Sequence, residues 1–509
     1  MCSSDLKNTR NLLTLILLIV TFLISGCGEK KEKTVKDTLV YGQLTDPKTL
    51  DPQISTDQYS QNAIAQIYDR LFEINESNGE PVLSLAKSYE RINDKTLAIT
   101  LNENVRFHNG DYLTAEDVKF TLERAMNSPR VGHLYKLIDN IEIVDDHNLI
   151  ITTKETFAPL LNHLSHKSSS VLNKEVFEKI GEEEYFQNPV GTGAYKVKSW
   201  DLGDKITLEA VPKYFKGDAK IKYIVIKTVP EENSKVIGLE TGELDMVLDV
   251  PAIAWDSILS SDTMDIKTGP STTTAYMGLN TQKGILTDKD VRKAIAMAVD
   301  KDAIIDTIFL GKVTKAEQFI SPVVFGHNKN AKSLPFDPEA AKKIIEEKGL
   351  VGAPLKIVVS SPERVQMATI VQAQLKNIGL DLTIELLEWG TFLAETGNGN
   401  VDMFIMGWGP STYDGDYGYY PNLHSNQLGS DGNRAFFVNK EMDTYLDLAK
   451  SELDTEKRKE YYDKIREIIV EENPIVPLYH GNSTYGIRKN LKNVTPAGYP
   501  EFYKYEFSN

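Results

Sequence analysis

The sequence predicts an α/β protein built of two lobes of related construction. Two segments, LETGELDMVLDV (239–250) and LAETGNGNVDMFIMGWG (393–409), each run from a helical pattern through glycine to an aspartate and then a short apolar strand. Short continuous apolar strands that follow helices are typical of α/β lobes with partly parallel sheets. A chain of 509 residues is also too long for one ordinary hydrophobic core. No polar or proline-rich stretch is long enough to separate independent domains, so we expect closely joined lobes.

Residues 96–127 predict two short strands followed by a helix. Apolar residues alternate over 97–101 as in a half-buried strand, and Val105 and Phe107 suggest a partner strand after turn residues. Thr114 and Asp117 have the spacing of a capping box, which predicts that a helix begins just after Thr114. The apolar residues of this helix fall on one face: Val118, Leu122, Ala125 and Met126.

A second strong helical pattern covers residues 286–311. Thr287 and Asp290 suit its start, and Gly311 suits its end. The apolar stripe of this helix consists of Val291, Ala294, Ile295 and Ala298. We expect both helical segments to have a structural role in the fold.

The N-terminus has the layout of a lipoprotein signal, which we assign to residues 1–27. Lys7 and Arg10 precede an apolar run over 12–24 that is too short to span a bilayer as a stable helix. The run ends in Ile-Ser-Gly-Cys, and small residues before Cys27 resemble the bacterial lipobox, in which the cysteine is acylated. A soluble signal peptide that ends near a cysteine is the alternative.

Cysteine usage supports lipidation at Cys27. The only other cysteine of the sequence is Cys2, which would be removed with the signal, so Cys27 would have no disulfide partner. The charged residues 28–36 are interpreted as a flexible tether between the anchor and the lobes.

The acidic composition limits the class of partner. The formal net charge is −16 and the pI is near 5.1. Nucleic acids and anionic lipid headgroups are bound by clustered Lys and Arg, so we expect neither as a partner. A cationic or zwitterionic ligand is compatible with this charge.

The motifs of familiar catalytic sites are missing from the sequence. It contains no G-x-x-x-x-G-K-[ST], H-E-x-x-H, C-x-x-C or G-x-S-x-G pattern. Glycine runs at Gly191 and Gly397 begin like a dinucleotide-binding fingerprint, but Lys196 and Asp402 stand where its third glycine belongs. We therefore expect no cofactor and no enzymatic activity.

The segment GWGPSTYDGDYGYYPNLHS (407–425) has the composition of a binding loop, with many glycines and aromatic residues, two aspartates and no lysine or arginine. Asp414 and Asp416 imitate the opening of a calcium loop, but Tyr419 replaces its glycine and Ser425 its bidentate glutamate. As a glycosidase pair, these aspartates would have to flank a bond at a separation that one short loop rarely provides.

The eight histidines are scattered along the chain. His163 and His166 have a spacing that could bring them to one helical face, but a surface or hydrogen-bonded role is the plainer interpretation. We expect no metal, although a site shared by His424 and His480 stays open as an alternative.

Ordered blocks along the chain resemble the family 5 extracellular solute-binding proteins, the oligopeptide, dipeptide and nickel-type receptors of ABC importers. VRFHNGDYLTAEDVKFTLERAM (105–126) is similar to the family signature, and Ala194 replaces the usual proline in a GTGPY-like block. The resemblance covers essentially the whole mature chain. The further blocks are NPVGTGAYKVKSWDLGDKITLEAVPKYFKG (188–217), YMGLNTQKGILTDKDVRKAIAMAVDKDAII (276–305), LPFDPEAAKKIIEEKG (334–349), VDMFIMGWG (401–409) and IVEENPIVPLYHGNSTYGIRKN (469–490).

The resemblance implies a two-lobed α/β fold of the periplasmic-binding-protein type II, with an extra subdomain in the first lobe. By analogy, the first lobe holds residues 37–280 and 480–509, with the extra subdomain at about 55–185, and the second lobe holds 281–479. Chain crossings near 280–283 and 475–480 are the hinge candidates.

The resemblance also implies which residues contact a ligand. In peptide-binding members an aspartate after the GW strand pairs with the ligand α-ammonium, and Asp414 and Asp416 are the matching candidates. The spacing departs from the Gly-Asp-x-x-Asp-Pro pattern of dipeptide receptors and is more similar to the glutathione-receptor branch. A buried ammonium needs such a partner because an isolated charge is costly to desolvate.

Further ligand contacts are expected from aromatic residues and an arginine. Trp408, Tyr413 and Tyr417 are candidates to wall a peptide, since aromatic rings offer large contact surfaces and tyrosine adds a hydroxyl. Arg364 lies near the place where dipeptide receptors bind the ligand carboxylate, and a solvent-facing arginine at a helix start is the alternative.

The sequence thus predicts a lipid-anchored, extracytoplasmic, monomeric receptor that delivers short peptides, such as a dipeptide, an oligopeptide or glutathione, to the permease subunits of an ABC importer. Two alternatives are kept. One is a receptor of the same fold for a nickel chelate, haem or a sugar. The other is a secreted lipoprotein hydrolase that uses Asp414 or Asp416 as acid or base.

Overall fold

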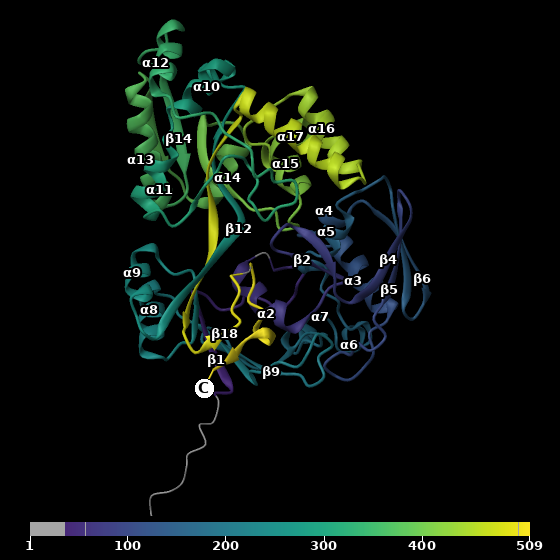
Figure 1. Ribbon diagram of the computed structural model, residues 1–509. Helices are drawn as coiled ribbons and strands as arrows, with labels where there is room; N and C mark the ends of the chain where they lie inside the picture. The colour runs from purple at the N-terminus through teal and green to yellow at the C-terminus, as the bar shows by residue number, and fades with distance from the viewer. Residues whose placement is uncertain (1–35, 56, 497, 509) are drawn as a thin grey trace, which may run out of the picture.

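The computed structural model describes residues 36–55, 57–496 and 498–508. Within them the chain forms two lobes, one above the other in Figure 1, and a smaller unit beside them. Cys27 and the proposed signal lie outside the described residues, as do all but the last residue of the proposed tether.

One sheet of eleven strands runs through both lobes. The first lobe contains the end built on β1, and the second lobe contains the end built on β14. In spatial order the strands are β15 (Asp381–Leu386), β14 (Pro354–Val359), β16 (Met403–Trp408), β12 (Met264–Leu279), β17 (Ile475–Arg488), β11 (Met246–Leu248), β1 (Thr38–Gln43), β10 (Tyr223–Thr228), β9 (Lys205–Ala210) and β8 (Tyr195–Asp201), with β13 (Thr314–Lys315) paired to β17.

Each lobe contains a parallel group of strands, as the two similar segments predict. β11 and β10 both run parallel to β1, and β15 and β16 both run parallel to β14. The aspartate that precedes β11 in the first lobe and the aspartate that precedes β16 in the second lobe have the same role. Asp245 accepts a hydrogen bond from the Val40 backbone N–H (2.9 Å), and Asp402 accepts one from the Lys356 backbone N–H (2.9 Å). The aspartate therefore ties the start of its own strand to the neighbouring parallel strand.

The long antiparallel strands β12 and β17 carry the chain between the lobes. Figure 1 shows them side by side, rising from the lower lobe into the upper one. Their register shifts between Pro270 and Thr274, opposite the segment His480–Asn482. Residues 280–283 follow the end of β12 inside the second lobe, where Asn280 donates to the carbonyl of Val401 (3.2 Å). We therefore propose that the first hinge lies at the register shift within β12.

The smaller unit is a four-stranded antiparallel sheet with its own core, which extends from Leu71 to Val171. The predicted strand 97–101 is confirmed, but Val105 and Phe107 form no strand, because β5 hydrogen-bonds to two strands from elsewhere in the chain. The four strands are β4 (Ala86–Asn93), β5 (Thr96–Leu101), β7 (Asn148–Thr153) and β6 (Ile138–Asp145). Separate from this sheet, two short sheets pair β2 (Phe72–Asn75) with β3 (Glu80–Leu83) and β18 (Leu491–Lys492) with β19 (Glu506–Phe507).

The helices on the first lobe and its smaller unit include the one predicted from the capping box. Asp117 accepts hydrogen bonds from the Thr114 backbone N–H (2.9 Å) and hydroxyl (2.8 Å), so α3 begins as predicted. These helices are α2 (Gln58–Ile67), α3 (Ala115–Met126), α4 (Gly132–Tyr135), α5 (Leu160–Leu164), α6 (Lys174–Ile180), α7 (Glu182–Gln187), α8 (Glu232–Thr241) and α9 (Trp255–Leu259).

The predicted helix over 286–311 is in fact two helices, α10 (Lys289–Ala298) and α11 (Lys301–Phe309). The break arises because the Asp300 side chain accepts from two backbone N–H groups ahead of it and starts a new helix. The cap of α10 is Asp288 and not Thr287. The predicted apolar stripe is nevertheless buried.

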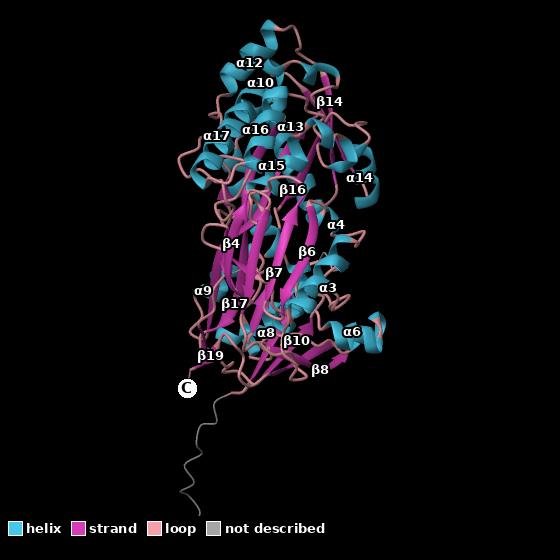
Figure 2. Cartoon of the chain, turned by 90° about the vertical axis from the view of Figure 1, so that its right-hand side faces the viewer, coloured by secondary structure: helices cyan, strands magenta, loops and turns pink. Residues whose placement is uncertain are grey.

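The remaining helices cover the second lobe, at the top of Figure 2. They are α12 (Pro338–Glu347), α13 (Pro362–Asn377), α14 (Trp389–Gly397), α15 (Gly415–Leu423), α16 (Lys440–Ser451) and α17 (Thr455–Glu472). They enclose two cores, one on each face of β14 and β16. Among the described residues we find no helix with the length and apolarity needed to cross a membrane.

Candidate functional site

The end of β16 separates two cavities. Side chains alternate between the two faces of a strand. Accordingly, Ile405 belongs to the core on the α13 face, whereas Met406 and Trp408 belong to the core on the opposite face. Gly407 lines a cavity on the first face, which we call the hinge cavity, and Trp408 lines one on the second, which we call the aromatic cavity.

The aromatic cavity has a volume of about 460 Å³ and lies between the second lobe and the smaller unit of the first. Its chemistry is a single carboxylate among aromatic rings, with lysines at the wall. From the second lobe it is lined by Trp408, Asp416, Tyr417, Tyr420, Pro421, Gln427 and Lys450, and from the smaller unit by His133, Leu134, Lys136, Leu137, Phe157 and His163.

Asp414 is enclosed in the protein and already neutralised. Its carboxylate accepts two hydrogen bonds from the Arg458 guanidinium (2.8 and 3.1 Å) and one from the Tyr462 hydroxyl (2.9 Å). It also accepts from the Asp416 backbone N–H (2.8 Å) and so caps α15. The side chain is fully buried and lines neither cavity.

Asp416 lines the aromatic cavity and has a carboxylate without a partner. Within the described part of the chain, no hydrogen bond or ion pair reaches its oxygens. Burial, together with the negative charge of Asp414, raises the pKa of Asp416 to about 7, although Lys450 and Arg458 act in the opposite direction. A cationic ligand group would neutralise the negative charge of this carboxylate.

The three predicted aromatic residues separate into two groups. Trp408 and Tyr417 both line the aromatic cavity, where the Trp408 indole N–H donates to the Tyr417 carbonyl (2.9 Å). Tyr413 lines neither cavity, and its hydroxyl donates to Glu76 of the first lobe (3.3 Å). Its backbone is in the left-handed region, with φ of 58°. Tyr413 therefore joins the two lobes in this arrangement.

Several contacts join the second lobe to the smaller unit around the aromatic cavity. Asn162 donates to the Thr412 carbonyl (3.1 Å), and the Ala158 backbone N–H donates to the Lys450 carbonyl (2.9 Å). The His133 ring hydrogen-bonds with the Tyr417 hydroxyl (3.1 Å). The lobes are thus closed against each other, and the cavity walls come from both sides.

Of the histidine pair His163 and His166, only His163 lines the cavity. Its Nδ1 lies 2.6 Å from the Leu134 carbonyl oxygen, and burial lowers its pKa to about 4. His163 is therefore neutral near pH 7. The His166 ring turns to the Ser168 hydroxyl (2.7 Å).

The hinge cavity, of about 290 Å³, contains Arg364. Arg364 lies in the first turn of α13, with one guanidinium N–H donating to the Ser360 hydroxyl (2.8 Å). A Cβ atom on Gly407 would come within 3.7 Å of the guanidinium, so a glycine leaves the arginine accessible there. The lining consists of Gln58, Asp249, Ser271, Thr273, Ala275, Glu363, Arg364, Met367, Ile405, Gly407, Tyr479, Gly481, Asn482 and Ser483.

Sequence patterns miss several of these residues. Asp249 lies within the quoted segment 239–250, but no feature there sets it apart from Asp245, which serves the fold. Arg458 is 44 residues away from the carboxylate that it neutralises. Tyr420 belongs to the quoted loop, and its helical spacing from Asp416 would have indicated a shared face.

The histidines of the metal alternative lie in separate places. His424 is near Asp443 and Asp447 in the second lobe, whereas His480 bonds to Thr274 between the two long strands. Among the described residues, no group of three or more His, Cys, Asp or Glu side chains is arranged to hold a metal ion.

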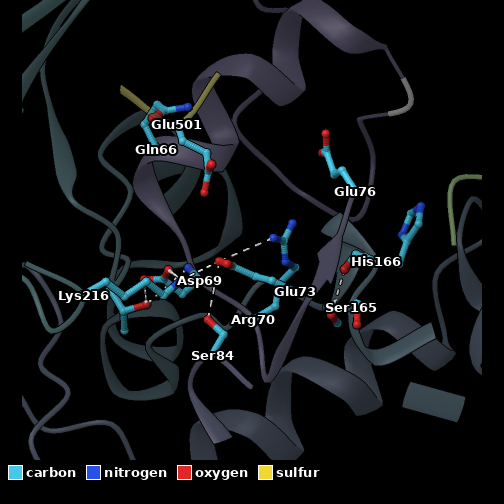
Figure 3. Close-up of polar contacts among 12 residues, drawn as sticks. Gln66, Asp69, Arg70, Glu73, Glu76, Ser84, Ser165, His166, Lys216 and Glu501 are labelled. Atoms are coloured by element: carbon cyan, nitrogen blue, oxygen red, sulfur yellow. Dashed lines mark hydrogen bonds and ion pairs between the residues drawn. The ribbon is translucent and has the colours of Figure 1, made fainter. Parts of the chain in front are cut away.

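A charged network in the first lobe is internally balanced (Figure 3). Lys216 contacts both Asp69 and Glu73, and Arg70 lies 3.7 Å from Glu73. Burial alone would raise the pKa of Glu73, but these cations lower it to about 2. Glu76 stands apart from this network and accepts a hydrogen bond from the Tyr413 hydroxyl, so Glu76 itself supports the interlobe contact.

Comparison with known proteins points to one family, and relatives within it bind different ligands. A family model described as "Bacterial extracellular solute-binding proteins, family 5 Middle" matches residues 80–430. The chain is 25% identical to the oligopeptide-binding protein AppA of Bacillus subtilis, covering 96% of each chain. It is 28% identical to the glutathione-binding protein GsiB of Salmonella typhi, covering 87% of this chain and 89% of that one. A structure of DppA from Helicobacter pylori in complex with the peptide STSA matches with a TM-score of 0.79 and 26% identity, over 95% of this chain and all of the other.

Proposed function

We propose, because this chain belongs to the bacterial extracellular solute-binding proteins of family 5, that it captures a short peptide or peptide-like solute between its lobes and delivers it to the permease of an ABC importer. The peptide ligand class is taken from three of its relatives. One is an oligopeptide-binding protein, another binds glutathione, and the DppA structure holds a peptide. The function is therefore binding and release, with no covalent step.

The observation that carries this proposal is the unpaired carboxylate of Asp416 in a cavity between the lobes. We propose that it neutralises the ligand α-ammonium, because a buried charge needs a partner. Of the two predicted aspartates, Asp414 already has Arg458. Trp408 and Tyr417 would contact the first residue of the peptide, and aromatic rings bind apolar groups without specifying one side chain.

The ligand carboxylate is assigned to Arg364. A guanidinium binds a carboxylate with two parallel hydrogen bonds, and the N-terminus of α13 adds favourable partial charge. Arg364 and Asp416 lie on opposite faces of the end of β16, so a peptide bound to both would pass over that strand end. Such a ligand contacts both lobes and would stabilise the closed arrangement by its higher affinity for it.

The alternatives receive less support from the site. The hydrolase hypothesis keeps only Asp416 of its two candidate acids or bases, because the Asp414 carboxylate is held by Arg458 and Tyr462. For a nickel centre, the described residues offer no group of three or more His, Cys, Asp or Glu side chains arranged to hold a metal ion. We also propose that Cys27 carries the lipid anchor, on the sequence pattern alone. Incorporation of labelled palmitate into the wild type, but not into a C27A variant, would support this anchor.

Calorimetry with small peptides tests the function. We expect the ligand-free protein to bind Ala-Ala-Ala and to bind its N-acetylated form much more weakly. Asp416→Asn should weaken the binding of Ala-Ala-Ala by roughly 10- to 100-fold, since a hydrogen bond to a charged group contributes about 1.5–3 kcal/mol. Asp306→Asn, at an exposed aspartate outside both cavities, is the matched control.

The outcomes separate function from assignment. If peptides bind but D416N leaves their affinity unchanged, the ammonium assignment is wrong. If no peptide binds and nickel–histidine, haem or a sugar does, the peptide function itself is wrong.

A further inference from the structure

The wall of the hinge cavity carries an excess of negative charge, which a bound ligand carboxylate would increase. Its charged wall groups are Asp249 from the first lobe and Glu363 and Arg364 from the second. These sum to one negative charge when all three are ionised. On the proposed function, a ligand carboxylate binds Arg364 in this same cavity, and it would raise the local charge to two negatives.

Asp249 is held firmly in place at the wall of this cavity. It follows β11 with a left-handed backbone (φ 56°), and its N–H donates to the Thr484 carbonyl (2.9 Å). The Lys235 ammonium donates to the carbonyls of Leu248 (2.7 Å) and Asp249 (3.1 Å) and so holds the same turn. The position of the carboxylate is thus set by backbone contacts and not by a salt bridge of its own.

The Asp249 side chain itself is unpaired. No hydrogen bond or ion pair within the described residues involves its oxygens. Burial raises its pKa, although the nearby Lys235 acts in the opposite direction. The Lys235 ammonium is directed at the two carbonyls, so it lowers the local negative charge but does not line the cavity.

Glu363 differs from Asp249 because it has protein neighbours. Burial raises its pKa, but the charge of the adjacent Arg364 and the Tyr479 hydroxyl act in the opposite direction. The carboxylate that remains for a ligand is therefore that of Asp249, which lines the same cavity of about 290 Å³ as Arg364. The opposite charges of this cavity come from opposite lobes.

We propose that the hinge cavity binds the last residue of a basic peptide, with the carboxylate at Arg364 and a side-chain amine at Asp249. Since this rests on the proposed function, in which Asp416 takes the α-ammonium, the preferred ligand has two positive groups and one negative group. A short peptide that ends in lysine or ornithine has this charge pattern. Its end residue connects Asp249 of the first lobe to Arg364 of the second and so favours closure.

Matched tripeptides test the proposal. Ala-Ala-Lys and Ala-Ala-norleucine have end residues of similar size and differ in the terminal amine. We expect the wild-type protein to bind Ala-Ala-Lys roughly two- to fivefold more tightly, the range expected for one partly exposed ion pair. Asp249→Asn should bind both peptides with the affinity that the wild type has for Ala-Ala-norleucine.

Asp262→Asn is the matched control, because Asp262 is an exposed aspartate of the first lobe that lines neither cavity. It should keep the lysine preference, and thermal melting should show that both variants are folded. Equal binding of the two peptides by the wild type would overturn this inference and leave the proposed function standing. Persistence of the lysine preference in D249N would also overturn it. If neither peptide binds, the proposed function fails, and the inference fails with it.

Discussion

The ion-pair cluster around Asp414 and the aromatic cavity around Asp416 are neighbouring regions that start from the same helix, α15. In the first region, every oxygen of the aspartate is used by Arg458, Tyr462 or the helix backbone. In the second, the carboxylate faces a cavity and has no partner among the described residues. A buried charge serves the fold when the protein itself neutralises that charge. A buried charge without a partner in the protein is available to bind a ligand.

The largest effect is expected from a substitution that breaks the ion-pair cluster around Asp414. Asp414→Ala would leave Arg458 as a buried charge without a partner, and loss of one member of a buried pair costs about 3–5 kcal/mol. Urea denaturation followed by circular dichroism should show this loss in the free energy of unfolding. Asp416→Asn is the control, and we expect it not to lower the stability, because the raised pKa of Asp416 shows that its ionised form is unfavourable in the folded state. A D414A variant as stable as the wild type would contradict the comparison.

The second effect is a pH dependence that only the unpaired aspartate should produce. The pKa of Asp416 is about 7, so the empty cavity holds a largely protonated acid at pH 5 and a largely ionised one at pH 8. Because an ammonium binds the ionised form, peptide affinity should rise from pH 5 to pH 7. Two pH units below the pKa correspond to a reduction of up to about 100-fold.

Calorimetry from pH 5 to 7.5 measures this dependence. The slope should be lost in D416N, whose amide does not titrate. The Asp306→Asn control should keep it. A pH-independent affinity in the wild type would show that the ligand does not depend on this carboxylate.

The smallest effect concerns the contact that closes the aromatic cavity. Tyr417→Phe keeps the ring but removes the hydroxyl that bonds to His133 of the smaller unit (3.1 Å). One neutral hydrogen bond contributes about 0.5–1.5 kcal/mol, so peptide affinity should fall roughly two- to tenfold. Tyr420→Phe, on the same helix, is the control because its hydroxyl contacts Asn426 and Asp447 of its own lobe. Equal losses in both variants would exclude a specific role for the closing contact.

The fold was predictable where the interactions are local. The capping box of α3 joins residues three positions apart, and the helix, aspartate and strand order recurs in both lobes. The break between α10 and α11 and the partners of β5 were not predictable from the same patterns. Helical periodicity continues through Asp300, and a strand is paired by residues that can lie anywhere in the chain.

From the sequence alone, the loop at 407–425 is recognisable as rich in aromatic and acidic groups, and Trp408, Asp416 and Tyr417 are close enough in the chain to share one wall. Which aspartate is free depends on the folded chain, because Arg458 comes from another helix. Folding also places Asp249 and Arg364 in the wall of one cavity. A carboxylate has the same chemistry at every position, so its role depends on which charges the fold places beside it.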